Sequence, residues 1–490
     1  MVVKIPATGE KRERKITAFG LHHHLLNAIL FFLKVSPMGS EKKPTQRSCV
    51  VDLLIILFGV SSWVAVNGLW VELPILVNTL PEHWKLASYI IITTQVANLG
   101  PILFSAARKI WSQKVLEIPI IHASLALVIV ACVLLSLFWD QTTFIFGAWH
   151  STSLFILTFF LAFVDCTSSL LYLPFIAHFK EQYVISYLVG SGLSGPVPGI
   201  LALAQGVGGY AECRNISKTT ETEFGNLTEY SIEAFYPPPR FSANIFFGVL
   251  CGQMLISWLA FILLNHLPAA KRERVSFLPL SLPSNPAIAE NFQSSIEKDF
   301  STSLEKSASA EQHLLGKPLL TTFQYAVILF VQAFISTMFN GVLLSIQTYS
   351  CLPYGSVAFH LTVTLSNIAN PLCCFLAMFL PVTKVWSVTG VAIYASAWAG
   401  YILTTALTSP EPPFVHVAFG AYLVVTAWIM VSGSVAYTKA CIASILRRAG
   451  GQVALYRCGV MTQIGSAVGA LVTFSLVQYT TLFKSYDPCS

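Results

Sequence analysis

Eleven long apolar stretches lie between Val51 and Tyr479, and almost none of them contains a charged residue. Each is about 20 residues or longer, which is the length that a helix needs to cross ~30 Å of hydrocarbon. Hydrophobic residues make up 54% of the 490-residue chain and charged residues only 11%, whereas soluble domains carry about 25% charged residues. A water-soluble fold of this composition would have too little polar surface. The chain is therefore predicted to be an all-α membrane protein with eleven transmembrane helices.

The long gap after the sixth apolar stretch divides the predicted bundle into six helices and five. The predicted regions are a basic, cytosolic N-terminal tail (1–50), an N-terminal bundle (51–267), a disordered cytosolic linker (268–320) and a C-terminal bundle (321–490). The predicted spans are 53–79, interrupted at Pro74, then 86–107, 118–138, 150–177, 184–208, 242–267, 321–346, 354–380, 385–407, 414–438 and 453–480.

The distribution of basic residues predicts the orientation, because cytosolic loops gather Lys and Arg. With the N-terminus inside, all but six of the 29 basic residues fall on the cytosolic side, and an odd number of spans places the C-terminus outside. The exceptions are Arg457 at an inner membrane edge and, outside, Lys85, Arg214, Lys218, Arg240 and Lys484. The net charge of +6 thus reflects topology and does not indicate nucleic-acid binding.

The predicted extracellular loop 209–241 carries two glycosylation sequons, at Asn215 and Asn226. A sequon by itself is a weak signal, but both of these fall in a loop that the charge distribution already places outside. We therefore expect glycosylation at both asparagines.

Three short motifs recur in the two bundles in the same order, six spans apart. The first pair is Asn67-Gly68-Leu69-Trp70 and Asn340-Gly341-Val342-Leu343; the second is Ala97-Asn98-Leu99-Gly100-Pro101 and Ser366-Asn367-Ile368-Ala369-Asn370-Pro371; the third is two runs of small residues, 190–199 and 465–470. Such an order predicts two parallel repeats about an axis normal to the membrane, as in major-facilitator-type carriers. Close helix packing alone would also explain the small-residue runs.

Glu72 and Asp165 are the only acidic residues well inside a predicted span, and no Lys or Arg lies there. An ionisable group in hydrocarbon costs roughly 2.5–3.5 kcal/mol on insertion scales, so it usually faces a cavity or a partner. Asp165 shares a polar helix face with Ser168 and Tyr172, which predicts either a cavity wall or a polar contact between helices. Glu72 lies in the outer third of its span, beside Pro74, where it lines an external vestibule or touches water at the interface.

Neutral amides are the commonest polar side chains at membrane depth: Asn67, Gln95, Asn98, Gln332, Asn340, Asn367 and Asn370. A single amide more often joins helices than binds a ligand. Several in matching positions of two repeats predict a central polar cavity. Trp70 and Tyr172 are the aromatic residues expected to stack on a flat ligand. His122 and His360 lie inside spans and titrate near neutral pH, so either could make transport proton-sensitive.

Three cysteines fall outside by the predicted topology: Cys213, Cys351 and Cys489. Extracellular cysteines can oxidise, and we expect Cys351 to pair with Cys489, with Cys213 free or as an alternative partner. The sequence contains no Walker loop, His-Glu-x-x-His, Cys-x-x-Cys or Gly-x-Ser-x-Gly motif. Neither an ATP-driven pump nor an enzyme is predicted, and no metal or cofactor is expected.

The stretch from Ser62 to Pro74 resembles the first-helix signature of the vertebrate riboflavin transporters, solute carrier family 52. The resemblance continues in Phe163–Ser169, Leu173–Phe175, Gly192–Gly195 and Tyr349–Gly355 and covers roughly residues 50–490. The Val-Asp-Cys-Thr-Ser-Ser run is most similar to the third, proton-sensitive, epithelial member. The basic extension before Met38 departs from the family pattern.

The resemblance implies eleven spans, a cytosolic N-terminus, a plasma-membrane location and sodium-independent uptake of riboflavin. Riboflavin has a flat ring, a uracil-like edge and a chain of hydroxyls, and it carries no net charge. The absence of Lys and Arg from the predicted spans suits it and argues against phosphorylated flavins.

An alternating-access carrier with a major-facilitator-like or equilibrative-nucleoside-transporter-like bundle is therefore expected. Its predicted substrate-binding residues are Asn67, Trp70, Asn98, Tyr172, Asn340 and Asn367, and its predicted proton-coupling residues are Glu72, Asp165, His122 and His360. Two alternatives remain: a carrier of other neutral heteroaromatics such as nucleosides, which has the same physical needs, and, from a different class, a membrane receptor that binds its ligand without transporting it. The sequence indicates no partner besides the substrate and the lipid bilayer, and it does not indicate an oligomeric state.

Overall fold

The computed structural model describes residues 48–110, 117–145, 147–180, 182–207, 209, 212–222, 225–274, 320–380, 382–485 and 489. The chain divides into Met1–Arg47, which lies outside the described residues, and a compact unit from Ser48 to Ser490. The predicted basic tail and residues 275–319 of the predicted linker therefore fall outside the described part of the chain.

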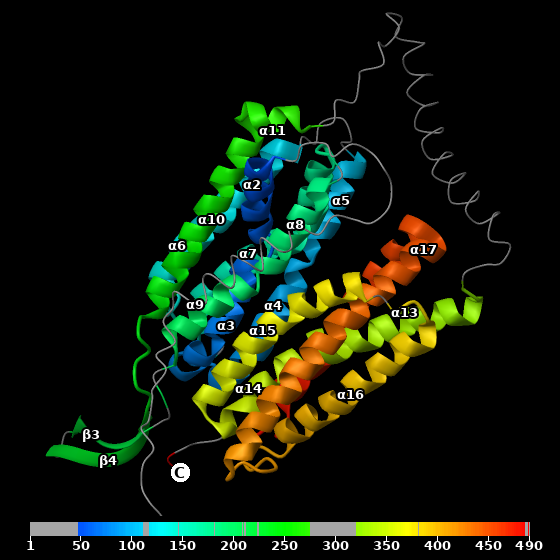
Figure 1. Cartoon of the computed structure of the whole chain (residues 1–490). Coiled ribbons are helices and arrows are strands. Elements are labelled where there is room, and N and C mark those ends of the chain that lie inside the picture. Colours follow the sequence, from blue (N-terminus) through cyan, green and yellow to red (C-terminus); the bar gives the residue numbers. More distant parts are fainter. Residues whose placement is uncertain are drawn as a thin grey trace, which may run out of the picture. The chain divides into compact units, whose positions relative to one another are not determined.

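The first half of the compact unit runs from Ser48 to Arg274 and is mainly helical (Figure 1). Its elements are α2 (Cys49–Val60), α3 (Val64–Thr79), η1 (His83–Lys85), α4 (Leu86–Ala97), α5 (Leu99–Ile110), α6 (Glu117–Phe138), β1 (Thr143–Ile145), β2 (Ala148–His150), α7 (Thr152–Ala177), α8 (Gln182–Leu193), α9 (Pro196–Gln205), β3 (Glu212–Thr222), β4 (Gly225–Phe235), α10 (Ala243–His266) and α11 (Pro268–Arg272).

The second half runs from Leu320 to the C-terminus. Its elements are α13 (Thr322–Ser336), the π-helical turn η2 (Thr337–Leu343), α14 (Gln347–Cys351), η3 (Leu352–Tyr354), α15 (Ser356–Phe379), α16 (Val385–Leu407) and α17 (Ala418–Tyr479). Gly450 and Gly451 interrupt α17 with non-helical backbone angles, so that it consists of two spans, Ala418–Gly451 and Val453–Tyr479, joined at a kink.

Within the described residues, ten helices are long and apolar enough to cross a membrane, and α2 with α3 makes an eleventh span bent by 52°. The prediction of eleven spans is thus confirmed. The interruption of the first span was placed wrongly, because α3 continues through Pro74 and the chain bends at residues 61–63. Two adjacent serines cause this break: the Ser61 hydroxyl donates to the Phe58 carbonyl at 2.7 Å, which competes with regular helical pairing.

Several other spans are also irregular at mid-membrane. Asn98 separates α4 from α5, and Ser194 with Gly195 separates α8 from α9. In the second half, Asn340 and Gly341 lie within the π-helical turn η2. Irregular backbone at membrane depth is tolerated where it is buried in protein or lines a cavity. These breaks therefore mark the level at which a polar site is expected.

The two ends of the bundle differ. We call the end with η1, η3 and the β3–β4 hairpin the hairpin end, and the end with Ser48, α11 and Leu320 the linker end (Figure 1). Strands β3 and β4 pair antiparallel through their full lengths, with Cys213 opposite Ala234. Asn215 is exposed on β3, and Asn226 lies on β4.

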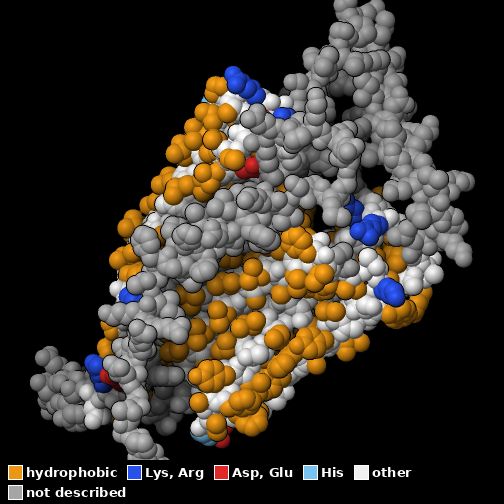
Figure 2. All heavy atoms as spheres, viewed as in Figure 1, with side chains coloured by type: hydrophobic (Ala, Val, Ile, Leu, Met, Phe, Trp, Pro, Cys, Tyr) orange, Lys and Arg blue, Asp and Glu red, His pale blue; other side chains and the backbone are white. Residues whose placement is uncertain are grey.

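The outer face of the helices is apolar. Figure 2 shows hydrophobic side chains spread over the visible face of the bundle, with the Lys and Arg side chains toward its ends. Exposed side chains on this kind of surface include Val130, Ile156, Leu259, Ile393 and Leu471. A soluble protein seldom exposes so continuous an apolar surface, and a lipid environment accounts for it.

The two small-residue runs pack in corresponding ways. In the first half, a Cβ on Gly59 would lie 2.8 Å from the Tyr187 carbonyl oxygen, so α2 and α8 touch through their backbones. In the second half, a Cβ on Gly341 would lie 2.5 Å from the Cα of Gly469. Span one therefore packs on span five as span seven packs on span eleven, which is the relation that the predicted repeats require.

The predicted disulfide is wrong in the structure. Cys489 pairs with Cys213 of β3, with the two Cα atoms 5.5 Å apart, and Cys351 is a free thiol that is fully buried in α14. The hairpin brings Cys213 to the C-terminal tail, whereas helix packing removes Cys351 from the surface. The disulfide thus joins the first half of the unit to the second.

A non-reducing digest of the purified protein should yield one cross-linked peptide pair that contains Cys213 and Cys489. Cys351 should react with an alkylating reagent only after unfolding, because its side chain is buried. Recovery of a Cys351–Cys489 pair by mass spectrometry would contradict this connectivity.

Gly341→Ala is expected to lower the free energy of unfolding by about 1–3 kcal/mol, because the added methyl group overpacks a backbone contact. Gly400→Ala is the matched control, since a Cβ at Gly400 meets no atom within 4 Å. Thermal unfolding of both variants in detergent measures the difference. Equal unfolding midpoints would show that the contact at Gly341 is not tight.

Candidate functional site

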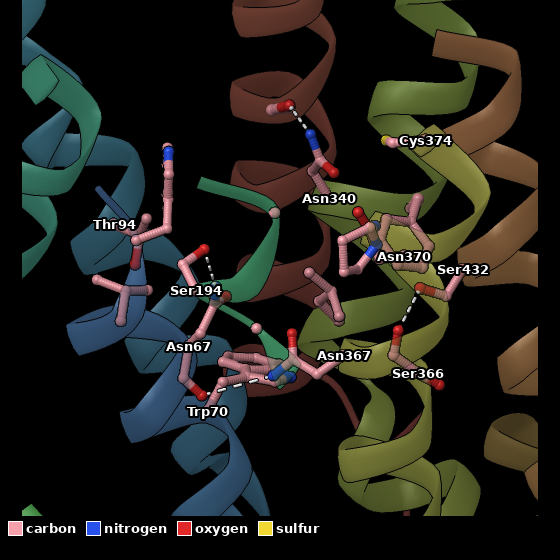
Figure 3. A pocket seen from close by; sticks show the side chains of 18 of the residues that line it. Asn67, Trp70, Thr94, Ser194, Asn340, Ser366, Asn367, Asn370, Cys374 and Ser432 are labelled. Carbon is pink, nitrogen blue, oxygen red and sulfur yellow. Dashed lines mark hydrogen bonds between the residues drawn. The ribbon is translucent and has the colours of Figure 1, made fainter. Parts of the chain in front are cut away.

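A cavity of about 590 Å³ lies between the two halves at the level of the helix breaks. Its size falls within the range typical of small-molecule sites. Side chains from α3, α4, α8, η2, α15 and α17 form most of its wall. Figure 3 shows Asn67, Trp70 and Ser194 of the first half across the cavity from Asn340, Asn367 and Asn370 of the second half.

The cavity lining is uncharged and combines many polar groups with a larger apolar surface. Eight amides line it: Asn67, Gln95, Asn98, Asn340, Gln347, Asn367, Asn370 and Gln463. Seven hydroxyls, Thr94, Ser191, Ser194, Ser366, Ser432, Thr462 and Ser466, and five aromatic side chains, Trp63, Trp70, Phe339, Phe375 and Trp428, complete its polar and flat surfaces. None of the lining side chains in the described part of the chain is charged or a histidine. Such a wall suits a neutral ligand with both flat and hydrogen-bonding surfaces.

On the first-half wall, Asn67 and Trp70 lie one turn apart on α3. The Asn67 Nδ2 donates to the Ser194 hydroxyl at 3.4 Å, across to the break between α8 and α9. The Trp70 indole N–H donates to Gln347 Oε1 at 3.1 Å, so this ring is held by the opposite half. Asn98 donates to Gln95 Oε1 at 3.2 Å on α4.

On the second-half wall, Asn340 is held from two sides. Its Nδ2 donates to the Ser466 hydroxyl at 2.9 Å, and its Oδ1 accepts from Lys439 Nζ at 3.0 Å. Lys439 lies on α17 behind the cavity wall, with its Nζ 6.0 Å from the centre of the Phe339 ring. Within the described residues no carboxylate forms an ion pair with Lys439.

The two asparagines occupy corresponding places in the repeats. Asn67 of span one bonds to Ser194 of span five, and Asn340 of span seven bonds to Ser466 of span eleven. Both serines in turn donate to a backbone carbonyl of their own segment, at 2.7 and 2.8 Å. The predicted repeat is therefore present in the hydrogen bonding of the site as well as in the helix order.

The cavity is sealed on its hairpin side by contacts between the halves. Trp84 of η1 packs on Tyr349 of α14 with ring centres 5.6 Å apart. The side chain of Gln478 donates to the Ser88 hydroxyl at 3.5 Å, and the side chain of Asn367 donates to the backbone carbonyl of Asn67 at 3.5 Å. The first two contacts lie at the hairpin end, and the Asn367–Asn67 contact lies in the cavity wall itself.

Toward the other end, the cavity continues along α15. Its lining includes Pro371, Phe375 and Met378, and Met378 is one residue before the end of α15 at the linker end. Leu188 of α8 lies on the facing wall. The cavity therefore extends from mid-membrane toward the linker end.

Five of the six predicted substrate-binding residues line this cavity: Asn67, Trp70, Asn98, Asn340 and Asn367. Tyr172 does not. It is fully buried in an aromatic cluster, with its ring 4.5 Å from that of Phe58, and Phe58 also packs on Phe175 and Phe261. The polar stripe on α7 joins helices, because Ser168 donates to the Ser62 carbonyl at 3.1 Å.

The two predicted acidic residues are buried behind the wall. Asp165 Oδ2 accepts from the Val66 N–H at 3.1 Å, in the first turn of α3, where a carboxylate satisfies a free donor and opposes the positive end of the helix dipole. Glu72 Oε1 accepts from Gln205 Nε2 at 2.9 Å. Its other oxygen, Glu72 Oε2, and the amide oxygen Gln205 Oε1 are both buried and have no hydrogen-bond partner among the described residues.

The two predicted histidines lie in different surroundings, and neither lines the cavity. His122 of α6 accepts at Nδ1 from the Trp258 indole at 2.9 Å and packs against Phe261. His360 of α15 is buried, 5% exposed. The structure brings neither of them next to the predicted substrate-binding residues.

The prediction missed Lys439, Gln347 and Gln463. The predicted tenth span ended at residue 438, whereas the tenth membrane helix continues to Gly451. The expectation that no Lys lies inside a span was therefore wrong. Continued apolar residues after Lys439, in Ala440-Cys441-Ile442, are the sequence signal that would have extended the span.

Comparison with known proteins agrees with this architecture. A family model described as "Solute carrier family 52, riboflavin transporter" matches residues 47–485. The chain is 39% identical over 442 residues to solute carrier family 52, riboflavin transporter, member 3-A of Danio rerio, covering 90% of this chain and 98% of that protein. It is 40% identical over 453 residues to riboflavin transporter 2 of Salmo salar, with the same coverage of 90% and 98%.

A solved structure shows the same fold. The crystal structure of a POT family transporter in complex with 5-aminolevulinic acid aligns with a TM-score of 0.51 and 10% sequence identity, covering 87% of this chain and 90% of that chain. At this identity the likeness concerns the fold alone, and it confirms the predicted major-facilitator-like bundle. The family model and the relatives decide the family: the chain belongs to solute carrier family 52, a family of riboflavin transporters and not of enzymes.

Proposed function

We propose that this protein carries riboflavin into the cell across the plasma membrane by alternating access, without sodium and with a dependence on pH. The observation that carries the proposal is the uncharged, amide-lined cavity between two repeats that is sealed on one side. Membership of the riboflavin transporter family supports the choice of substrate.

The chemistry of the cavity matches the parts of riboflavin. Trp63 and Trp70 offer flat apolar faces for the isoalloxazine ring, and aromatic rings prefer offset stacking. Asn67, Asn98, Asn340 and Asn367 offer amide groups to the uracil-like edge, while serine and threonine hydroxyls suit the ribityl chain. Independence from sodium is proposed because it is what the resemblance to the family implies.

The contacts between the halves support alternating access. In the predicted topology the hairpin end is extracellular, so the cavity extends toward the cytosol while Trp84 and Tyr349 close the outside. Opening to the outside requires these contacts and the Trp70–Gln347 hydrogen bond to break. Loading of the substrate and movement of the halves would thus be coupled through Trp70, which belongs to both the cavity wall and the seal.

Glu72 and Gln205 support a dependence on pH. Glu72 Oε2 and Gln205 Oε1 have no partner among the described residues, and both are acceptors, so the ionised pair lacks a hydrogen that could lie between them. A proton on Glu72 would supply a donor between α3 and α9, next to the cavity wall. Asp165 is a second proposed proton site, because its Oδ1 is also buried with no partner in the described part of the chain. For His122 and His360 a proton-coupling role remains a prediction from the sequence.

Asn67→Ala is expected to raise the KM for labelled riboflavin by about 5- to 100-fold, because a hydrogen bond in a cavity is worth roughly 1–3 kcal/mol when its partner is left unpaired. Asn78→Ala is the matched control on the same helix, since among the described residues the side chain of Asn78 bonds to the Pro74 carbonyl of its own helix alone. Uptake by cells with equal surface expression measures both. An unchanged KM in Asn67→Ala would remove this residue from the site.

Uptake of labelled riboflavin should exceed that of its phosphate ester, because no charged side chain lines the cavity to pair with a dianion. Strong competition by uridine would instead favour a carrier of neutral heteroaromatics in general. Saturable binding without accumulation in proteoliposomes would favour a receptor.

Riboflavin uptake is expected to rise as the pH falls, because protonation completes the Glu72–Gln205 pair. Glu72→Gln imitates the protonated carboxyl and should hold uptake near its low-pH level at every pH. Initial rates for the wild type, Glu72→Gln and Asp165→Asn across a pH series test this. If both variants keep the wild-type pH profile, neither carboxyl couples protons to transport.

A further inference from the structure

The corresponding asparagines of the two repeats differ in one contact. Asn340 Oδ1 accepts from Lys439, whereas in the described part of the chain no donor contacts Asn67 Oδ1. Each Nδ2 bonds to a serine hydroxyl. The two amides therefore present different hydrogen-bonding groups to the same cavity.

Two independent contacts determine the orientation of the Asn340 amide. A lysine ammonium only donates, so the oxygen of the amide must face Lys439. The Ser466 hydroxyl already donates to the Thr462 carbonyl at 2.8 Å, so toward Asn340 it must accept, and the nitrogen must face it. A flipped amide would place two donors together on one side and an acceptor against an acceptor on the other.

This orientation leaves Asn340 as a donor toward the cavity. Its Nδ2 carries two hydrogens, of which one is used by Ser466, while one of the two lone pairs of its oxygen accepts from an ammonium. A hydrogen bond from a charged donor polarises the amide and strengthens the bond that its N–H group makes. Asn67, by contrast, keeps its oxygen available as an acceptor.

We propose that Lys439 is a positioning residue that makes Asn340 a dedicated donor for a carbonyl oxygen of the substrate, while Asn67 accepts an N–H group. The inference rests on the proposed transport of riboflavin and assigns its specificity. The substrate feature that it selects is a carbonyl next to an N–H on a flat ring, as on the uracil-like edge of a flavin. Lys439 acts through Asn340 and does not itself line the cavity.

The test uses the purified full chain in proteoliposomes, with riboflavin and analogues in which one ring carbonyl is replaced by thiocarbonyl. Sulfur is a weaker acceptor than oxygen, so the wild type should show a higher KM for the analogue whose altered position faces Asn340. In Lys439→Met the KM for riboflavin should rise about tenfold, as expected for loss of one charge-assisted hydrogen bond. The KM ratio between that analogue and riboflavin should fall toward one.

Lys439→Arg is the conservative variant, and it should restore most of the analogue discrimination because it keeps a charged donor. The double variant Lys439→Met with Asn340→Ala should be no weaker than Asn340→Ala alone, because Lys439 acts only through this asparagine. Asn340→Asp should lose the discrimination although it pairs better with Lys439, since it offers acceptors in place of the donor. A purely structural role for Lys439 would change transport without changing the analogue ratio.

Wild-type KM values and an unchanged analogue ratio in Lys439→Met would overturn the inference, as would additive losses in the double variant. If Lys439→Met fails to reach the membrane, Lys439→Gln carries the same measurement, because its neutral amide does not impose one orientation on Asn340. A wild-type protein that accumulates no riboflavin would instead refute the proposed function. The two failures are therefore distinguishable.

Discussion

The constraint that shapes this protein is the cost of leaving a polar group without a partner in hydrocarbon. The helices satisfy their own backbone, and their outer surfaces are apolar. The polar side chains of the spans are instead directed inward, where they pair with one another or line the cavity between the halves. Breaks at Asn98, at Ser194 and in η2 around Asn340 follow the same rule, because their loosened backbone lies beside that cavity.

The two repeats share a framework and differ in charge. Glycine contacts bring span one against span five and span seven against span eleven, and an asparagine–serine hydrogen bond accompanies each contact. On span four, Asp165 bonds to the first turn of α3, just before Asn67; on span ten, Lys439 bonds to Asn340 itself. Asp165 in the first half and Lys439 in the second thus support corresponding elements of the site, α3 and η2. Because an acidic side chain lies behind one wall and a basic side chain behind the other, the two walls of the repeated scaffold differ. An asymmetric molecule can then bind between them in one orientation.

Much of this architecture could be predicted because lipid imposes simple rules on length and polarity. Span boundaries followed from hydropathy, and Asn67, Asn98, Asn340 and Asn367 stood out because amides are rare in apolar helices. Lys439 was missed because a positive charge at the end of an apolar run reads as a membrane boundary, although the helix continues past it. Tyr172 was misassigned because hydropathy does not show which face of α7 meets the aromatic cluster of Phe58 and Phe261. The partner of Cys489 depends on where the base of the β3–β4 hairpin lies relative to the C-terminal tail, which no local pattern encodes.

The Cys213–Cys489 bond has a mechanical consequence for any cycle in which the halves move apart. It joins the β3–β4 hairpin, which lies between α9 and α10, to the segment that follows α17. A covalent link therefore connects the two halves at the hairpin end. The two halves can move apart at this end only as far as the length of the linked chain segments allows. Cys213 is the second residue of β3 and lies at the base of the hairpin, so the length of the hairpin beyond it adds nothing to the link. The widest opening of the outer vestibule is therefore set by the chain that leads from α9 to Cys213 and from α17 to Cys489.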